Sequence, residues 1–251
     1  MEQTRFDTYH EMFMKYKNRE ISLKQLKQFQ FNPKNYRLES PSANRSHLYE
    51  QRRGCMIIVN SFDAALEADF SEFKRLYSGD INQINPYTKY NLLETLLCKN
   101  HNMSERIAIA RYLIDKGIDV NHLCGKYKRN ALHLLFFNFL RGDIPYLLEM
   151  TKLLVSSGVD VNAVDKFNAI PLNYAISICK GETEDYRSVY EFLLKAGSDY
   201  NLKDFKGKSC LDYAKEFSWR NGFIKIVEDF EKRKNKEIEE ILEKNPYNDL
   251  F

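Results

Sequence analysis

The sequence has no apolar run that approaches the roughly 18 to 20 residues a membrane-spanning helix needs. Its most apolar stretch is GCMIIV, residues 54–59. The first residues, MEQTRFDTYHEMF, lack the cationic segment and following apolar segment of a secretory signal. We therefore expect a cytoplasmic protein with no membrane span.

Familiar catalytic signatures are missing as well. The sequence contains no G-x-S-x-G, G-x-x-x-x-G-K-[ST], G-x-G-x-x-G or H-E-x-x-H pattern. Two short words, Cys98-x2-His101 and His122-x-Cys124, resemble pairs of metal ligands in residue type and spacing, but neither has a C-x-x-C partner. We therefore predict a protein that is not an enzyme, with no catalytic residue, no metal site and no cofactor.

The overall charge is close to balanced. Of 251 residues, 43% are hydrophobic and 29% charged, with a net charge of +3. This composition excludes a disordered chain. A net charge this small disfavours nucleic acid as the partner, because it provides little counterion release. The five cysteines are dispersed and odd in number, which is typical of reduced thiols in a cytosolic protein.

Two short words recur through most of the chain. The first is a helix ending such as LLVSSGVDVN, residues 153–162, and the second is a helix beginning such as NALH, residues 130–133. Both recur at intervals of 39 to 41 residues. Such a period indicates stacked structural units. The recurring positions are Asp80, Asp119, Asp160 and Asp199 in the first word, and Leu93, Leu132, Leu172 and Leu211 in the second.

Each unit is predicted to be a helix, a turn, a second helix and an extended hairpin. A small polar residue before the leucine suits the N-cap of the first helix. Gly117, Gly158 and Gly197 follow the second helix, where glycine adopts the left-handed conformation without a Cβ penalty. Asp-x-Asn then leads into the hairpin.

The words NALHLL and TKLLVSSGVDVNAVDKFNAIPLNYA resemble the ankyrin repeat. The resemblance covers roughly residues 60 to 217, with units near 40 residues and the Thr-Pro pair degraded in every copy. It implies an all-α fold, an α-solenoid of four to five repeats. It also implies that His133 bonds neighbouring backbone at its helix, and that the hairpin asparagines satisfy loop backbone groups. Those asparagines are Asn121, Asn162 and Asn201.

The chain divides into three predicted parts. Residues 1–54 are an N-terminal helical cap or small module, and residues 55–217 are the repeat array. Residues 218–251 are a C-terminal capping helix and tail, with an apolar stripe along one helical face. The stripe comprises Phe223, Ile226, Val227, Phe230, Ile238, Ile241 and Leu242.

The hairpin tips carry aromatic residues interleaved with lysines. Such a row suits a partner protein with an acidic or apolar patch, bound on the concave face of hairpins and first helices. The alternative is that the rings pack on adjacent hairpins and the lysines only keep the tips soluble. The predicted partner-binding residues are Tyr87, Lys89, Tyr127, Lys128, Lys166, Phe167, Phe205, Lys206 and Lys208.

We therefore predict a non-catalytic protein–protein interaction module. One alternative is a bacterial effector delivered to the host cytosol, since EIEEILEKNPYNDLF, residues 237–251, is similar to effector signals. A second is an enzyme with its site in residues 1–54 or in the loops between helices, near His47, Cys55 or the carboxylates Glu182, Glu184 and Asp185.

Overall fold

A computed structural model describes residues 12, 14–30, 58, 60–139, 143–179 and 181–243. The chain divides into two compact units, residues 1–57 and 58–251. Where the structure describes it, the chain is helical, and its only extended pairing is one isolated antiparallel bridge, Cys124 with Arg129. The all-α prediction is therefore confirmed for the described residues. None of their helices is both long enough and apolar enough to cross a membrane.

In the first unit the structure describes helix α2, Leu23–Gln30. Ser22 begins it, because its hydroxyl accepts the Gln25 N–H at 3.3 Å while the Gln25 side chain accepts the Ser22 N–H at 2.8 Å. Leu26 is buried. His47 and Cys55, two residues of the enzyme alternative, lie outside the described residues.

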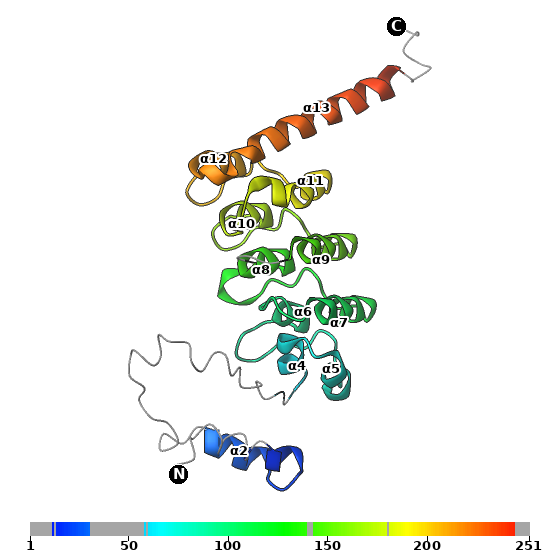
Figure 1. Cartoon of the computed structure of the whole chain (residues 1–251), viewed down its shortest axis with the longest axis vertical. Coiled ribbons are helices and arrows are strands. Elements are labelled where there is room, and N and C mark those ends of the chain that lie inside the picture. Colours follow the sequence, from blue (N-terminus) through cyan, green and yellow to red (C-terminus); the bar gives the residue numbers. More distant parts are fainter. Residues whose placement is uncertain are drawn as a thin grey trace. The chain divides into compact units, whose positions relative to one another are not determined.

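The second unit is built from pairs of helices stacked in two layers (Figure 1). The first helix of each pair packs on the first helix of the next, and the second helices do the same. The first helices are α4 (Ser61–Glu67), α6 (Leu92–Leu96), α8 (Ala131–Asn138), α10 (Pro171–Ser177) and α12 (Cys210–Glu216). The second helices are α5 (Phe70–Leu76), α7 (Met103–Asp115), α9 (Ile144–Ser156), α11 (Arg187–Lys195) and α13 (Gly222–Glu243). Three 3₁₀ turns lie between them: η2 (Gly125–Tyr127), η3 (Thr183–Tyr186) and η4 (Ser218–Arg220).

The predicted leucine register forms the core of the first-helix layer. Leu93, Leu132 and Leu172 are each 0% exposed. Leu211 is half-buried, because α12 is the last first helix that the structure describes. Stacking therefore buries each unit on its neighbours, as expected for repeats that cannot form a core alone.

The first helices begin as the recurring word predicts. Asn91, Asn130 and Ser209 are the N-caps of α6, α8 and α12, and each accepts an N–H from the residue three positions on. In α10 the cap is Ile170, whose own N–H donates to the Asn173 side chain at 2.9 Å. The fourth residue of the word therefore closes a capping box, or half of one in α10.

The second helices end at the predicted glycines. Gly117, Gly158 and Gly197 have φ of 82°, 89° and 88°. At α9 the following residue, Val159, donates its N–H back to Leu154 at 3.2 Å, so a carbonyl at the helix end is satisfied.

Hairpin asparagines join each unit to the next. Asn121 accepts the Asp160 N–H at 2.7 Å and donates to the Gly158 carbonyl at 2.9 Å. Asn162 repeats both bonds one unit later, at 2.8 Å to Asp199 and 2.8 Å to Gly197. The prediction for these two asparagines is confirmed: they satisfy main-chain groups that the helix ends and loops would otherwise leave unpaired.

Helix α13 packs against α11 and α12. Phe223 and Ile226 are 0% exposed, whereas Ile238 is 46% exposed. The predicted apolar stripe is therefore buried at Phe223 and Ile226 and exposed at Ile238, and the side chains of Ile241 and Leu242 lie outside the described part of the chain. The predicted boundary at residue 218 falls between α12 and α13, which contact each other.

Two buried arginines hold the loops that follow first helices. Arg106, at the start of α7, donates to the carbonyls of Leu66, Leu96 and His101. Arg220 donates to the carbonyls of Ile176 at 2.8 Å and Gly181 at 2.9 Å. Both side chains are completely buried. Each guanidinium thus satisfies carbonyls at the end of a first helix, where cations are favoured.

Candidate protein-binding edge at the hairpin tips

Four hairpins lead into the first helices α6, α8, α10 and α12. We call them the first to fourth hairpin: residues 85–90, 124–129, 165–169 and 204–208. Each is closed by one main-chain bond between its end residues, of 2.8, 2.8, 3.0 and 2.9 Å in that order. The tips therefore have a defined conformation and stand at equivalent places in successive units.

Side-chain carboxylates support the third and fourth hairpins from within. Asp165 accepts the N–H groups of Phe167 and Ala169, and its second oxygen accepts the Tyr174 hydroxyl at 2.5 Å. In the fourth hairpin Asp204 is bound in the same way, with Tyr213 as the hydroxyl donor at 2.5 Å. These tyrosines lie on the first helices, so each tip is fixed to the helix layer.

One position in every tip adopts the left-handed conformation. Lys89, Lys128, Asn168 and Gly207 occupy it, with φ of 62°, 54°, 54° and 72°. Glycine adopts this conformation without a steric penalty and asparagine tolerates it. For a lysine the conformation costs roughly 1–2 kcal/mol. Two of the predicted binding lysines, Lys89 and Lys128, are therefore strained tip residues.

Three of the four predicted tip aromatics form one row of ring contacts, tilted by 32° and 44°, which we call the stack. The ring centroids of Tyr127 and Phe167 are 5.9 Å apart, and those of Phe167 and Phe205 are 5.4 Å apart. The main chains are also joined, since Lys166 N–H donates to the Tyr127 carbonyl and Phe205 N–H to the Phe167 carbonyl, both at 2.8 Å. Tyr87 stands outside this stack and is 92% exposed.

The stack is packed on one side and open on the other. Tyr127 remains 37% exposed and Phe205 62% exposed. The rings therefore do pack on adjacent hairpins, as the alternative interpretation holds, yet they still present area to a partner.

The cations of this edge fall into two groups. Lys126 and Lys206 lie over the rings of Tyr127 and Phe205, with Nζ 4.9 Å and 5.6 Å from the centroids. Lys166 is exposed beside them. Lys208 differs, because it forms an ion pair with Glu216. The charge of Lys208 is thus already compensated within the chain.

Sequence reasoning missed the role of Arg129. Its side chain is largely buried, donates to the Tyr174 hydroxyl at 2.9 Å and lies 4.1 Å from the Phe137 ring centroid. It also lies 5.0 Å from the Tyr127 ring centroid. Arg129 therefore supports the tip ring from behind.

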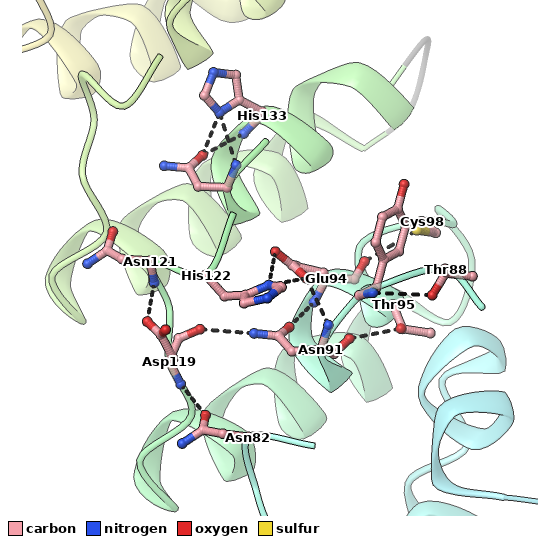
Figure 2. A network of polar contacts seen from close by, with 12 residues as sticks. Asn82, Thr88, Asn91, Glu94, Thr95, Cys98, Asp119, Asn121, His122 and His133 are labelled. Carbon is pink, nitrogen blue, oxygen red and sulfur yellow. Dashed lines mark hydrogen bonds and ion pairs between the residues drawn. The ribbon is translucent and has the colours of Figure 1, made fainter. Parts of the chain in front are cut away.

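A buried carboxylate lies behind the first hairpin. Glu94 is 1% exposed, accepts the Asn91 N–H at 2.8 Å and lies 2.9 Å from His122 Nδ1 (Figure 2). Burial raises the pKa of Glu94 to about 7, although the Asn91 N–H and His122 oppose this effect. Glu94 is the fourth residue of the recurring word, but no pattern indicated its contact with His122, because that contact comes from the following unit.

His133 has the structural role that the resemblance implies. Its Nδ1 accepts the Asn130 N–H at 3.2 Å, and its Nε2 lies 2.9 Å from the Ala169 carbonyl. Burial lowers the pKa of His133 to about 4, so the ring is neutral and donates from Nε2 at neutral pH.

One loop carboxylate of the enzyme alternative is engaged in an ion pair. Glu184 pairs with Arg187 at 2.6 Å. Within the described part of the chain, no three His, Cys, Asp or Glu side chains gather closely enough to share a metal ion.

Known proteins similar to this chain carry the words ankyrin repeat in their names. The ankyrin repeat domain-containing protein M-T5 of Myxoma virus (strain Lausanne) is 27% identical over 128 residues, 50% of this chain and 23% of that protein. Ankyrin repeat protein T5 of Rabbit fibroma virus (strain Kasza) is 27% identical over 127 residues, again 50% and 23%. Protein L271 of Acanthamoeba polyphaga mimivirus, whose name also includes ankyrin repeat, is 33% identical over 69 residues, 28% of this chain and 9% of that protein. The similarity thus spans less than a quarter of each relative.

A different family matches near the N-terminus. Residues 3–50 match the profile of GH-E, described as an HNH/ENDO VII superfamily nuclease with conserved GHE residues. Those residues contain no glycine, and His10–Glu11 is their one adjacent His-Glu pair. The segment therefore lacks one member of the set for which that family is described. Sequence reasoning had found no motif in this region.

Proposed function

We propose that the second unit is an ankyrin-repeat solenoid that binds another protein along its hairpin tips, without catalysis. The observation that carries this proposal is the stack of Tyr127, Phe167 and Phe205 with exposed lysines beside it. The relatives named above support repeats of this class.

The stack has the properties of a binding surface. Aromatic side chains give a large contact area for little loss of conformational entropy, and these three are already held by ring and main-chain contacts. The exposed Lys166 and Lys206 add positive charge. The fitting partner is a protein surface with an apolar or aromatic centre and acidic residues at its rim.

The first prediction reverses two tip charges. The double variant Lys166→Glu, Lys206→Glu is expected to weaken partner binding about tenfold, since like charges then face the acidic rim. The melting temperature should stay within about 1 °C, because both side chains are exposed and a surface substitution of this kind changes stability by less than about 0.5 kcal/mol. Lys208 is left unchanged, because its substitution would also break the ion pair with Glu216 and so mix a loss of stability with a loss of binding.

The matched control reverses two exposed charges on α13. Lys232→Glu, Lys234→Glu carries the same change in net charge on a different element. Affinity capture from the native cell, followed by titration of the captured protein, compares the variants. If the tip variant and the wild type bind the partner equally well, the tips are not part of the interface.

Delivery into a host by a bacterium stays a prediction. It rests on residues 237–251, of which the structure describes 237–243 as the last turns of α13. The relatives named above come from viruses.

A nuclease is the second candidate function, because residues 3–50 match the GH-E profile. The missing glycine weighs against it, and we expect no nuclease activity. The second prediction is that the full chain with Mg²⁺ nicks supercoiled plasmid no faster than the His10→Ala variant does. Nicking by the wild type that His10→Ala abolishes would make the N-terminal segment an enzyme.

A further inference from the structure

The tip stack is interrupted at one interval. Between the second, third and fourth hairpins, the rings touch and main-chain bonds join the tips. Between the first and second hairpins lies a cavity of about 370 Å³ instead, lined by Tyr87 from the first hairpin and Tyr127 from the second. We call this cavity the notch. Its size falls in the range of pockets that hold small ligands, about 300–1,000 Å³.

The second hairpin approaches the first at Gly125, which has φ of 53°. A Cβ on Gly125 would be 3.5 Å from the Thr88 carbonyl oxygen, an ordinary van der Waals distance. The notch therefore lies between two hairpins whose main chains are near neighbours. Tyr87 is 92% exposed and Tyr127 37% exposed, so both rings can be reached from solvent.

The lining of the notch is aromatic and cationic. Lys89, Lys126 and Arg129 contribute to it, and no carboxylate lines it. Lys126 already lies over the Tyr127 ring at 4.9 Å. Lys89 is one of the two lysines in the left-handed tip position, where a glycine would relieve strain. A ligand for this site therefore needs a flat apolar body and a negative charge next to it.

We propose that the notch binds one aromatic side chain of a partner protein segment, with acidic residues flanking it. The partner ring completes the stack between Tyr87 and Tyr127, and the flanking carboxylates reach Lys89 and Lys126. This inference rests on the proposed function, because it assigns one anchor point within the same binding edge. A protein segment fits better than a nucleic acid, since a chain of net charge +3 with three cations in the notch offers few phosphate contacts.

The test uses a defined probe on the full chain. The peptide acetyl-Asp-Glu-Trp-Glu-Asp-amide is titrated into isotope-labelled protein, and backbone amide shifts are followed by NMR. We expect shifts centred on residues 87–90 and 124–127. Tyr87→Ala is expected to weaken binding about tenfold or more, as loss of an aromatic anchor does. Tyr87 is nearly fully exposed, so this variant keeps the wild-type melting temperature.

Matched controls separate the contributions of the notch's charge, of its aromatic rings and of its position to peptide binding. Lys126→Glu should weaken binding of the acidic peptide. A peptide with lysines in place of the acidic residues should cause smaller amide shifts in the wild-type protein. Trp219→Ala removes an exposed ring on η4, outside the hairpin tips, and should leave peptide binding unchanged. Shifts centred on Phe167 and Phe205, no shifts at all, or tighter binding of an oligothymidylate would each overturn the proposal.

The outcome is also distinguishable from failure of the proposed function. If the double variant Lys166→Glu, Lys206→Glu weakens binding of the native partner but the Tyr87→Ala variant does not, the partner binds the tips and does not bind the notch. If neither change affects it, the binding edge itself is wrong.

Discussion

Replacing Arg106 by methionine is expected to lower the free energy of unfolding by about 3 kcal/mol or more. The guanidinium is completely buried and donates to the carbonyls of Leu66, Leu96 and His101. Methionine fills similar space but donates nothing, so three carbonyls lose a charged donor. Urea denaturation of the full chain measures the change.

Arg111 provides the control on the same helix. It is exposed and pairs with Glu149 at 3.0 Å, a contact of the surface type. Arg111→Met should therefore cost less than about 1 kcal/mol. Equal losses for the two variants would show that the buried contacts of Arg106 contribute no more than a surface ion pair.

The second large effect is a pair of opposed pH dependences. The folded-state pKa of Glu94, about 7, lies above the ordinary glutamate value of 4.5. Its contribution to stability is therefore full below pH 4.5 and is lost as the pH rises through 7. The folded-state pKa of His133, about 4, lies below the ordinary histidine value of 6.5. Its contribution is present above pH 6.5 and is lost as the pH falls through 4.

Two substitutions separate these contributions. Glu94→Gln keeps an oxygen for the Asn91 N–H, and its stability relative to wild type should rise between pH 4.5 and 7. His133→Asn places at this position the residue that α10 carries as Asn173, and its relative stability should rise as the pH falls from 6.5 to 4. Each difference should reach about 3 kcal/mol.

Chemical denaturation at intervals between pH 4 and 8 gives these differences. The slope of each difference with pH is the relevant quantity, because His133→Asn also loses the contact with the Ala169 carbonyl at every pH. A flat difference for Glu94→Gln would mean that His122 keeps the carboxylate charged throughout this range.

Much of the fold could be predicted because the units repeat. The leucines, the helix N-caps and the glycines after second helices recur at a fixed period, and each has a local physical reason to be where it is. The roles of His133 and the hairpin asparagines were implied by the resemblance to ankyrin repeats, and their bonds are to main-chain groups.

The remaining contacts occur in one unit each, so the repeat period could not predict them. Arginine is ordinarily a surface residue, so nothing marked Arg106 or Arg220 as buried donors to carbonyls. Glu94 meets His122 only after two units have stacked. At the tips, aromatic and lysine positions were predicted, but Lys208 pairs with Glu216, and Tyr87 stands apart from the stack.

The first helices α6 and α8 are joined where they end, because the Asn138 side chain donates to the Leu97 carbonyl at 3.1 Å. The notch lies at the opposite ends of these two helices, between the hairpins that lead into them. Rotation of one unit against the other about the Asn138 contact therefore changes the space between Tyr87 and Tyr127. A ring seated in the notch would resist that rotation and so stiffen the array at this interval.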